Sequence, residues 1–284
     1  DSMHLFHQRL HQILLQSSFG AAALVSLAVV FLMTQGFVQR FPENMRSWIV
    51  KSPGEYGNYV KDRHATVLNT PLSSIQPNLV LVGDSFSQDF YNMVLENEAF
   101  ADHSISTIYI EARCQLNFGF SWDETRLWIK DKDRTRCSKN QLTKTHQEMI
   151  KNADVVIFAF SWRDWSARRM AAVLQNLGLD TEQKVFVIGS KRFMSRRKAM
   201  QLDDPAATRV EPPVKDTETT QILREVLPYG IFVDTLALLC SSGCPLFTPN
   251  GELISHDGSH LTSAGARYVG GILFAAPPLS AYRP

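Results

Sequence analysis

One serine and one histidine in this chain have the surroundings that acyl-transfer chemistry needs. Ser85 follows the apolar run Leu79–Val82 and the pair Gly83–Asp84, and apolar residues then recur at helical spacing. This pattern places Ser85 where a buried strand turns into a helix. A helix N-terminus offers unpaired backbone N–H groups and a partial positive charge, which suit a nucleophile whose reaction builds an oxyanion.

A base for that serine is present near the end of the chain. His260 follows Asp257 by three residues, and residues three apart in a one-turn segment lie on the same side. We therefore predict that Asp257 orients His260 and that His260 faces Ser85. Such triads are recognised by the roles of their members and not by their order. A capped Gly-Asp turn is the alternative reading of residues 83–85, but the two motifs together favour catalysis.

Both motifs resemble conserved blocks of the SGNH hydrolases, also called GDSL esterases. Residues Gly83–Ser85 are similar to the first block, and Asp257–His260 are similar to the last. The longer run Cys240–Ala266 is more specific, because it resembles the SGNH domains that follow the membrane acyltransferase-3 domain in bacterial polysaccharide O-acyltransferases. The resemblance covers Gln35–Leu273 and implies a three-layer, flavodoxin-like α/β domain.

Strand and helix patterns alternate from residue 78 onward, which independently predicts an α/β fold. The strands are near-continuous runs of apolar residues, as expected for a parallel sheet covered by helices on both faces. Ligands bind beyond the carboxyl ends of such strands, where Ser85 and the loop after Phe160 both fall. The predicted strands are Leu79–Val82, Ser106–Ile110, Val155–Phe160, Lys184–Ile188 and Ile231–Val233, and the predicted helices are Ser87–Glu96, Lys139–Lys151, Ser166–Leu177, Thr217–Val226 and Thr262–Phe274.

The composition is globular, with 44% hydrophobic and 20% charged residues. A net charge of +1 gives no electrostatic case for binding nucleic acid. We expect four parts: an amphipathic helix over residues 1–17, a transmembrane helix over 18–38, a linker or extension over 39–76 and the SGNH domain over 77–284. A short helix is expected in the linker, around Asn44–Val50.

The membrane helix is predicted because residues 19–38 carry no charge, and about 20 apolar residues span a bilayer. A buried core helix and a cleaved signal peptide are the alternatives. Arg40, Arg46 and Lys51 follow the segment and only Arg9 precedes it, which by itself places the rest of the chain in the cytoplasm. The resemblance instead implies the bacterial inner membrane with the SGNH domain in the periplasm, and that is the location we expect.

The oxyanion hole departs from the family pattern. SGNH hydrolases usually contribute a glycine and an asparagine to it, but the segments Glu111–Gln115 and Ser161–Trp165 hold neither at the corresponding places. Arg113, Trp162 and Arg163 are the candidates to shape the site or to stabilise an oxyanion. The alternative is that Trp162 and Trp165 pack in the core and Arg163 pairs with a carboxylate.

Four cysteines, an even number, suggest two disulfides in a periplasmic domain. The sequence does not fix their connectivity, and the local pairings Cys114–Cys137 and Cys240–Cys244 are the ones we expect. A zinc site is the rival interpretation, since Cys240, Cys244, His256 and His260 have a finger-like spacing. We expect no metal, because the residues between the two histidines suit a helix poorly and zinc would consume the base for Ser85.

The segment Ser190–Lys215 is polar and is predicted to be a mobile loop. Its basic residues, Lys191–Arg192 and Arg196–Lys198, are interpreted as a solvated face. Contact with anionic glycan or lipid headgroups is the alternative.

These observations and the resemblance predict an O-acyltransferase that moves an acyl group, most simply acetyl, through an acyl-serine to a hydroxyl of a bacterial surface polysaccharide or lipid-linked glycan. In the family, a membrane acyltransferase-3 domain, in the same chain or separate, brings that group from acyl-CoA. We therefore expect no cofactor bound by this domain itself. The alternatives are a membrane-anchored periplasmic carbohydrate esterase with the same residues and a non-catalytic glycan-binding module.

Overall fold

The structure is a computed structural model that describes residues 17, 20–34, 36, 38–40, 46, 53–180, 182–199, 201, 202, 204 and 207–283. The chain divides into two compact units, residues 1–51 and residues 52–284. The predicted amphipathic helix over 1–17 and the predicted short helix over 44–50 lie almost entirely outside the described residues.

In the first unit, residues 20–33 are helical. Their large apolar side chains are exposed, with Leu24, Leu27 and Leu32 between 69% and 74% accessible. Among the residues that the structure describes, none of the helices has the length and apolar character required to cross a bilayer. The predicted membrane helix over 18–38 lies partly outside those residues and is not confirmed.

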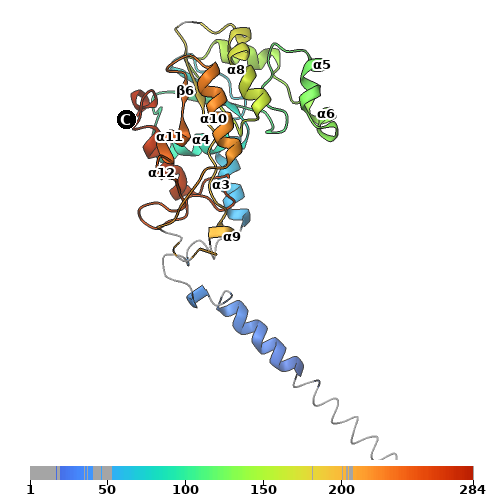
Figure 1. Ribbon diagram of the computed structural model, residues 1–284, viewed down its shortest axis with the longest axis vertical. Coiled ribbons are helices and arrows are strands. Elements are labelled where there is room, and N and C mark those ends of the chain that lie inside the picture. Colours follow the sequence, from blue (N-terminus) through green and yellow to red (C-terminus); the bar gives the residue numbers. More distant parts are fainter. Residues whose placement is uncertain are drawn as a thin grey trace, which may run out of the picture. The chain divides into compact units, whose positions relative to one another are not determined.

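The second unit alternates strands and helices, as Figure 1 shows. The helices are α3 (Pro53–Ala65), α4 (Ser85–Glu96), α5 (Trp122–Thr125), α6 (Asp131–Cys137), α7 (Lys144–Lys151), α8 (Asp164–Leu177), α9 (Arg196–Ala199), α10 (Val214–Val226), α11 (Thr235–Leu239) and α12 (Ser263–Leu273), with 3₁₀ turns η2 (Arg126–Trp128) and η3 (Leu279–Tyr282); a further turn, η1 (Val38–Arg40), belongs to the first unit. The strands are β1 (Asn78–Gly83), β2 (Ser104–Tyr109), β3 (Val155–Ala159), β4 (Lys184–Ile188), β5 (Arg209–Val210), β6 (Phe232–Val233) and β7 (Cys244–Pro245).

Five strands form one parallel sheet in the order β2-β1-β3-β4-β6. This is the flavodoxin-like order, and its topological switch point lies between β1 and β3. Gly83 at the end of β1 is in register with Tyr109 of β2 and Ala159 of β3, so three carboxyl ends meet at one edge. The parallel α/β fold predicted from the sequence is confirmed.

Alternate side chains of the strands pack in two hydrophobic cores, one on each face of the sheet. Leu79 and Leu81 of β1 belong to the core that contains residues of α4 and α12. Val80 and Val82 belong to the opposite core, which contains residues of α7, α8 and α10. All six residues of β1 are buried, as expected for a central strand covered on both faces.

The domain begins earlier than the sequence analysis expected. Helix α3 lies within the predicted linker, yet it packs against α4, where Asn92 Nδ2 donates to the Tyr59 carbonyl and Arg63 pairs with Glu96. Further on, Thr107 of β2 exchanges backbone hydrogen bonds with Val67 and Asn69. Residues 53–70 therefore cover one edge of the domain.

Both predicted disulfides are confirmed. Cys114 bonds Cys137, and Cys240 bonds Cys244, with S–S distances of 2.08 and 2.13 Å. The zinc interpretation is wrong, because the sulfurs of Cys240 and Cys244, its two thiolate ligands, are bonded to each other. Disulfides of this kind are typical of oxidising compartments.

Candidate active site

Ser85 stands on the turn between β1 and α4, at the switch point of the sheet. Asp84 is the N-cap of α4, and its Oδ1 accepts the backbone N–H of Phe86 at 2.8 Å. Ser85 is the first residue of the helix and is half-buried. The backbones of β1 and β3 lie very close together at Gly83. A Cβ on this residue would lie 1.9 Å from the Ala159 carbonyl oxygen, so only glycine fits here.

Asp84 also fastens the turn to the end of β3. Its carboxylate oxygens accept the backbone N–H of Ser161 at 3.0 and 3.2 Å. Burial raises the pKa of Asp84 to about 6, against the lowering effect of the N–H groups of Phe86 and Ser161 and of the Lys191 charge. The carboxylate thus holds the turn of Ser85 beside the carboxyl end of β3.

His260 and Asp257 are in direct contact. Asp257 Oδ2 lies 2.6 Å from His260 Nδ1, while Asp257 Oδ1 accepts the backbone N–H groups of Ser259 and His260. A proton on Nδ1 satisfies this contact and leaves Nε2 as the basic nitrogen. Across the loop, Ser255 Oγ donates to the His260 carbonyl and accepts the Gly258 N–H, which closes the turn.

Gly258 is required by that turn. Its φ is +89°, and a Cβ there would lie 2.7 Å from the Phe193 carbonyl oxygen. The Phe193 N–H in turn donates to the Gly258 carbonyl. The histidine loop therefore rests on the backbone that follows β4. Thr262, the first residue of the predicted helix Thr262–Phe274, is the N-cap of α12.

A buried ion pair attaches the histidine loop to the helix that carries Ser85. Asp89 lies one turn after Ser85 on α4, and its Oδ1 accepts the Leu261 N–H at 3.0 Å. Lys191 Nζ donates to Asp89 Oδ2 at 2.5 Å and to the Ser259 carbonyl at 3.1 Å. These contacts hold the residues on both sides of His260 against α4, the helix that begins at Ser85.

The charges around His260 favour its protonated form. Burial lowers the pKa of His260, but the hydrogen bond to Asp257 and the negative charges of Asp89 and Asp257 outweigh burial and raise it. For Asp257 the effect of burial has the opposite sign, because burial raises the pKa of a carboxyl group. The hydrogen bonds from His260 and Ser259 outweigh this effect and hold the pKa of Asp257 well below its usual range. Asp257 is therefore a carboxylate throughout the physiological pH range and stabilises an imidazolium at His260.

The interpretation of Lys191 and Arg192 as a solvated face is wrong. The Lys191 side chain is 4% exposed, and its ammonium lies 4.2 Å from the centroid of the Phe86 ring. Arg192 pairs with the buried Asp216 and donates to Ser161 Oγ. Each cation pairs with a buried carboxylate, Lys191 with Asp89 and Arg192 with Asp216. Both charged groups lie beside the turn that holds Ser85.

The three predicted oxyanion candidates are already engaged elsewhere. Trp162 is fully buried, and its indole N–H donates to the Ile188 carbonyl at 2.8 Å, so it packs as the alternative supposed. Arg113 pairs with Glu111 and Asp133. Arg163 Nε donates to the Ala112 carbonyl, which is a backbone partner and not the carboxylate that the alternative supposed.

Asp89, Lys191 and Arg192 were missed from the sequence. Asp89 carries a weak signal, because it stands four residues after Ser85 and therefore on the same helix face. Lys191 and Arg192 carry none, since two adjacent basic residues in a polar stretch normally indicate a solvated surface. Only the fold brings them to the carboxylates of Asp89 and Asp216.

Comparison with known proteins gives one family. The model for the SGNH domain, described as fused to AT3 domains, matches residues 57–274, which is more than half of the chain. None of the curated proteins compared with the chain matches it. The C-terminal catalytic domain of peptidoglycan O-acetyltransferase A of Streptococcus pneumoniae, solved with a methylsulfonyl adduct, is 9% identical, and the match covers 74% of this chain and 98% of that one. The TM-score of this match is 0.33.

Proposed function

This chain belongs to the SGNH domains that are fused to AT3 domains, and on that premise we propose that it is an O-acetyltransferase that uses Ser85 to acetylate a bacterial surface polysaccharide. The observation that carries the proposal is the contact of His260 with Asp257, in a loop that is tied to the helix of Ser85. Nucleophile, base and orienting carboxylate are the parts that acyl transfer requires.

In the first half-reaction, Ser85 Oγ attacks the acyl carbonyl carbon while His260 Nε2 takes the hydroxyl proton. The leaving group of the donor departs with that proton, and the acyl group remains as an ester of Ser85. In the second half-reaction, His260 takes the proton of a sugar hydroxyl as its oxygen attacks the acyl-serine. The sugar ester forms, and Ser85 regains its proton. Asp257 stabilises the imidazolium in both steps.

The oxyanion of each step would form at the N-terminus of α4. The Ser85 N–H has no partner within its own helix and no hydrogen bond to another described residue, and it carries part of the positive end of the helix dipole. Arg192 adds a guanidinium beside Phe86 and Ser161 at the same edge of the sheet. We therefore assign the electrostatic stabilisation mainly to the Ser85 N–H, in place of Arg113, Trp162 and Arg163. Arg192, whose guanidinium bonds Asp216 and Ser161 Oγ, would add only its positive charge.

The acyl donor would be delivered by an AT3 domain in the membrane, upstream in the same chain or as a separate partner, with acyl-CoA as the ultimate source. The family description supports this partner, because these SGNH domains are fused to AT3 domains. The two disulfides support a periplasmic location for residues 52–284. The exposed apolar side chains of residues 20–33 support contact of that helix with the bilayer.

An esterase is the second candidate, and one observation favours it. The side chains of His260 and Asp257 are 28% and 40% exposed, so water can reach the base. Hydrolysis and transfer share every step except the identity of the attacking hydroxyl.

The two candidates are separated by measuring acetylated glycan and free acetate in one assay. The full chain alone should hydrolyse small acetyl esters far below about 10 s⁻¹, the usual enzyme rate. Together with its AT3 partner it should acetylate polysaccharide, and Ser85→Ala should abolish this. Ester hydrolysis near 10 s⁻¹ without transfer would establish the esterase instead.

A further inference from the structure

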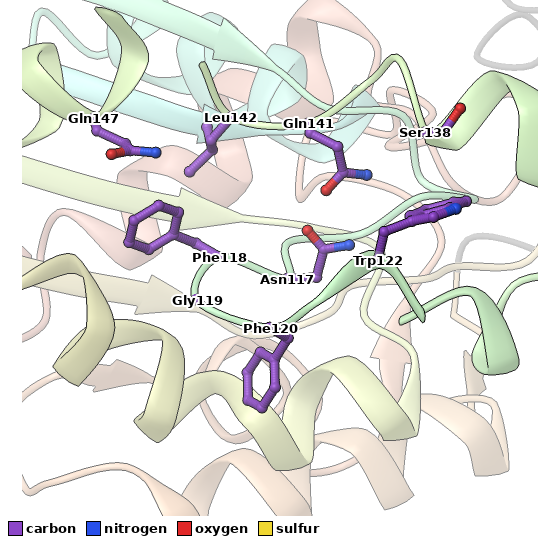
Figure 2. Close-up of a pocket in the computed structure, with 9 residues that line it drawn as sticks. All are labelled: Asn117, Phe118, Gly119, Phe120, Trp122, Ser138, Gln141, Leu142 and Gln147. Atoms are coloured by element: carbon purple, nitrogen blue, oxygen red, sulfur yellow. The ribbon is translucent and has the colours of Figure 1, made fainter. Parts of the chain in front are cut away.

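A cavity of about 300 Å³ lies beyond the carboxyl end of β2, outside the site described above. One wall comes from the loop that follows Cys114, and the other comes from the segment that follows Cys137 (Figure 2). The volume is at the small end of the range for ligand sites, about 300–1,000 Å³. It suits one end of a small molecule or one unit of a chain.

The lining combines aromatic rings with carboxamides. Figure 2 shows the Asn117 side chain directed into the space between Phe118 and Trp122, with Gln141 and Leu142 across from it. None of the described residues that line the cavity is charged. Flat apolar rings beside neutral donors and acceptors are the chemistry that recognises a neutral sugar, whose faces carry C–H groups and whose edges carry hydroxyls.

Asn117 is the most specific sign of a ligand. Only 7% of it is exposed, and its carboxamide makes no hydrogen bond to another described residue. The amide is directed to the open space of the cavity, where the hydroxyl or acetamide groups of a ligand could replace the solvent that contacts it. Gln141 Nε2 is held by the Cys137 carbonyl, which leaves its oxygen for the same ligand.

The cavity is built to keep its shape. The Cys114–Cys137 disulfide joins the starting points of both walls. Trp122 is the first residue of α5, and the capping box between Ser121 and Glu124 fixes that end of the helix. Phe120, another ring that lines the cavity, is held by the Arg169 guanidinium, which lies 4.4 Å from the centroid of the ring.

The cavity loop is also joined to the Ser85 turn. Gln115 is buried, with φ +56°, and its carboxamide bonds the Ser161 carbonyl and the Arg163 N–H. Ser161 is the residue whose N–H donates to Asp84. A chain of hydrogen bonds therefore runs from the base of the cavity loop to the residue before Ser85.

We propose that this cavity binds a neutral sugar unit of the polysaccharide acceptor and holds it while a nearby unit is presented to Ser85. The binding itself stands on the cavity, whereas the presentation to Ser85 rests on the proposed function. Asn117 and Gln141 would bond hydroxyl or acetamide groups, and Phe118 and Trp122 would cover the faces of the sugar ring.

The test is titration calorimetry and saturation-transfer NMR on the full chain in detergent, with chitotriose and cellotriose as neutral probes and trigalacturonic acid as the charged one. We expect at least one neutral probe to bind at least tenfold more tightly than the charged probe. Asn117→Ala and Trp122→Ala should each weaken it at least tenfold. The control Tyr229→Ala, at a fully exposed aromatic residue elsewhere, should leave it unchanged.

Ser85→Ala should bind the sugar as the unchanged protein does, so loss of catalysis and loss of the cavity give different results. Gln147→Ala, at the partly exposed rim, provides a variant that folds even where Trp122→Ala does not. No binding of either neutral probe, binding of the charged probe as tight as that of the neutral ones, or unchanged binding by both the Asn117 and Gln147 variants would each overturn the proposal.

Discussion

Asp89 Oδ1 accepts the backbone N–H of Leu261 at 3.0 Å, across 172 positions of sequence. The contact joins the helix that begins at Ser85 to the loop that holds His260. Lys191 neutralises the same carboxylate and reaches the loop through the Ser259 carbonyl. The position of the His260 loop relative to the helix of Ser85 therefore depends on the buried ion pair between Asp89 and Lys191.

Removing the cation of that pair should destabilise the domain strongly. Lys191→Met leaves the fully buried Asp89 carboxylate without its partner, and breaking a buried pair in this way costs about 3–5 kcal/mol. The double variant Asp89→Asn/Lys191→Met should recover much of the loss, because no buried charge remains and the amide oxygen can still accept the Leu261 N–H. Urea unfolding measures both. A loss below about 1 kcal/mol for Lys191→Met would contradict this role for the pair.

The reaction should depend on pH through His260. Only the neutral imidazole accepts a proton from Ser85, and the pKa of His260 is raised above its ordinary value of 6.5. The rate of acyl-serine formation should therefore rise with pH, with a midpoint above 6.5. Asp257→Asn removes the main raising interaction, so it should lower both the rate and the midpoint. A pH-independent rate between 5 and 9 would show that His260 is not the base.

Gly258 and Gly230 form a matched pair of substitutions. Both have positive φ, +89° and +85°, but a Cβ on Gly258 meets the Phe193 carbonyl at 2.7 Å, whereas a Cβ on Gly230 meets nothing within 4 Å. Gly230→Ala should cost only the backbone strain, about 1–2 kcal/mol, and should leave activity unchanged. Gly258→Ala should cost more and reduce acyl transfer at least tenfold, because it displaces the loop of His260. Equal effects in thermal unfolding and activity assays would contradict the docking of this loop on residues 193–195.

The two disulfides should contribute unequally to stability. Cys114–Cys137 closes a loop with a sequence separation of 23, and Cys240–Cys244 closes one of 4. The chain-entropy model gives about 3 kcal/mol for the first and about 2 kcal/mol for the second. Replacing each cysteine pair by serines and measuring urea unfolding tests the order. A larger loss from the short loop would show that packing, and not chain entropy, dominates.

Much of the sheet could be predicted because its strands are locally distinctive. β4 has the predicted bounds, and β1 and β3 differ from prediction only at their ends, since apolar runs covered on both faces leave a strong signal. Helix α3 was missed because Pro53, Gly54 and Gly57 are typical of a linker. Its contacts with α4 stabilise the helix, and the sequence of residues 53–65 by itself does not indicate this packing.

The candidate site could also be predicted only in part from the sequence. The contact of Asp257 with His260 follows from their spacing, and the strand-to-helix turn of Ser85 follows from the apolar pattern around it. The partners of Lys191 could not be predicted, because Asp89 lies 102 residues away and only tertiary packing brings the two together. The engagement of Trp162 with Ile188 is hidden for the same reason.

The central claim is that Ser85 is a nucleophile activated by His260. The most direct measurement is intact-mass spectrometry of the full chain after treatment with a sulfonyl fluoride, followed by peptide mapping. The account predicts one adduct per chain, on Ser85, absent from Ser85→Ala and formed at least a hundredfold more slowly by His260→Ala. Labelling of Ser85→Ala at the original rate, or an adduct mapped to another residue, would contradict it.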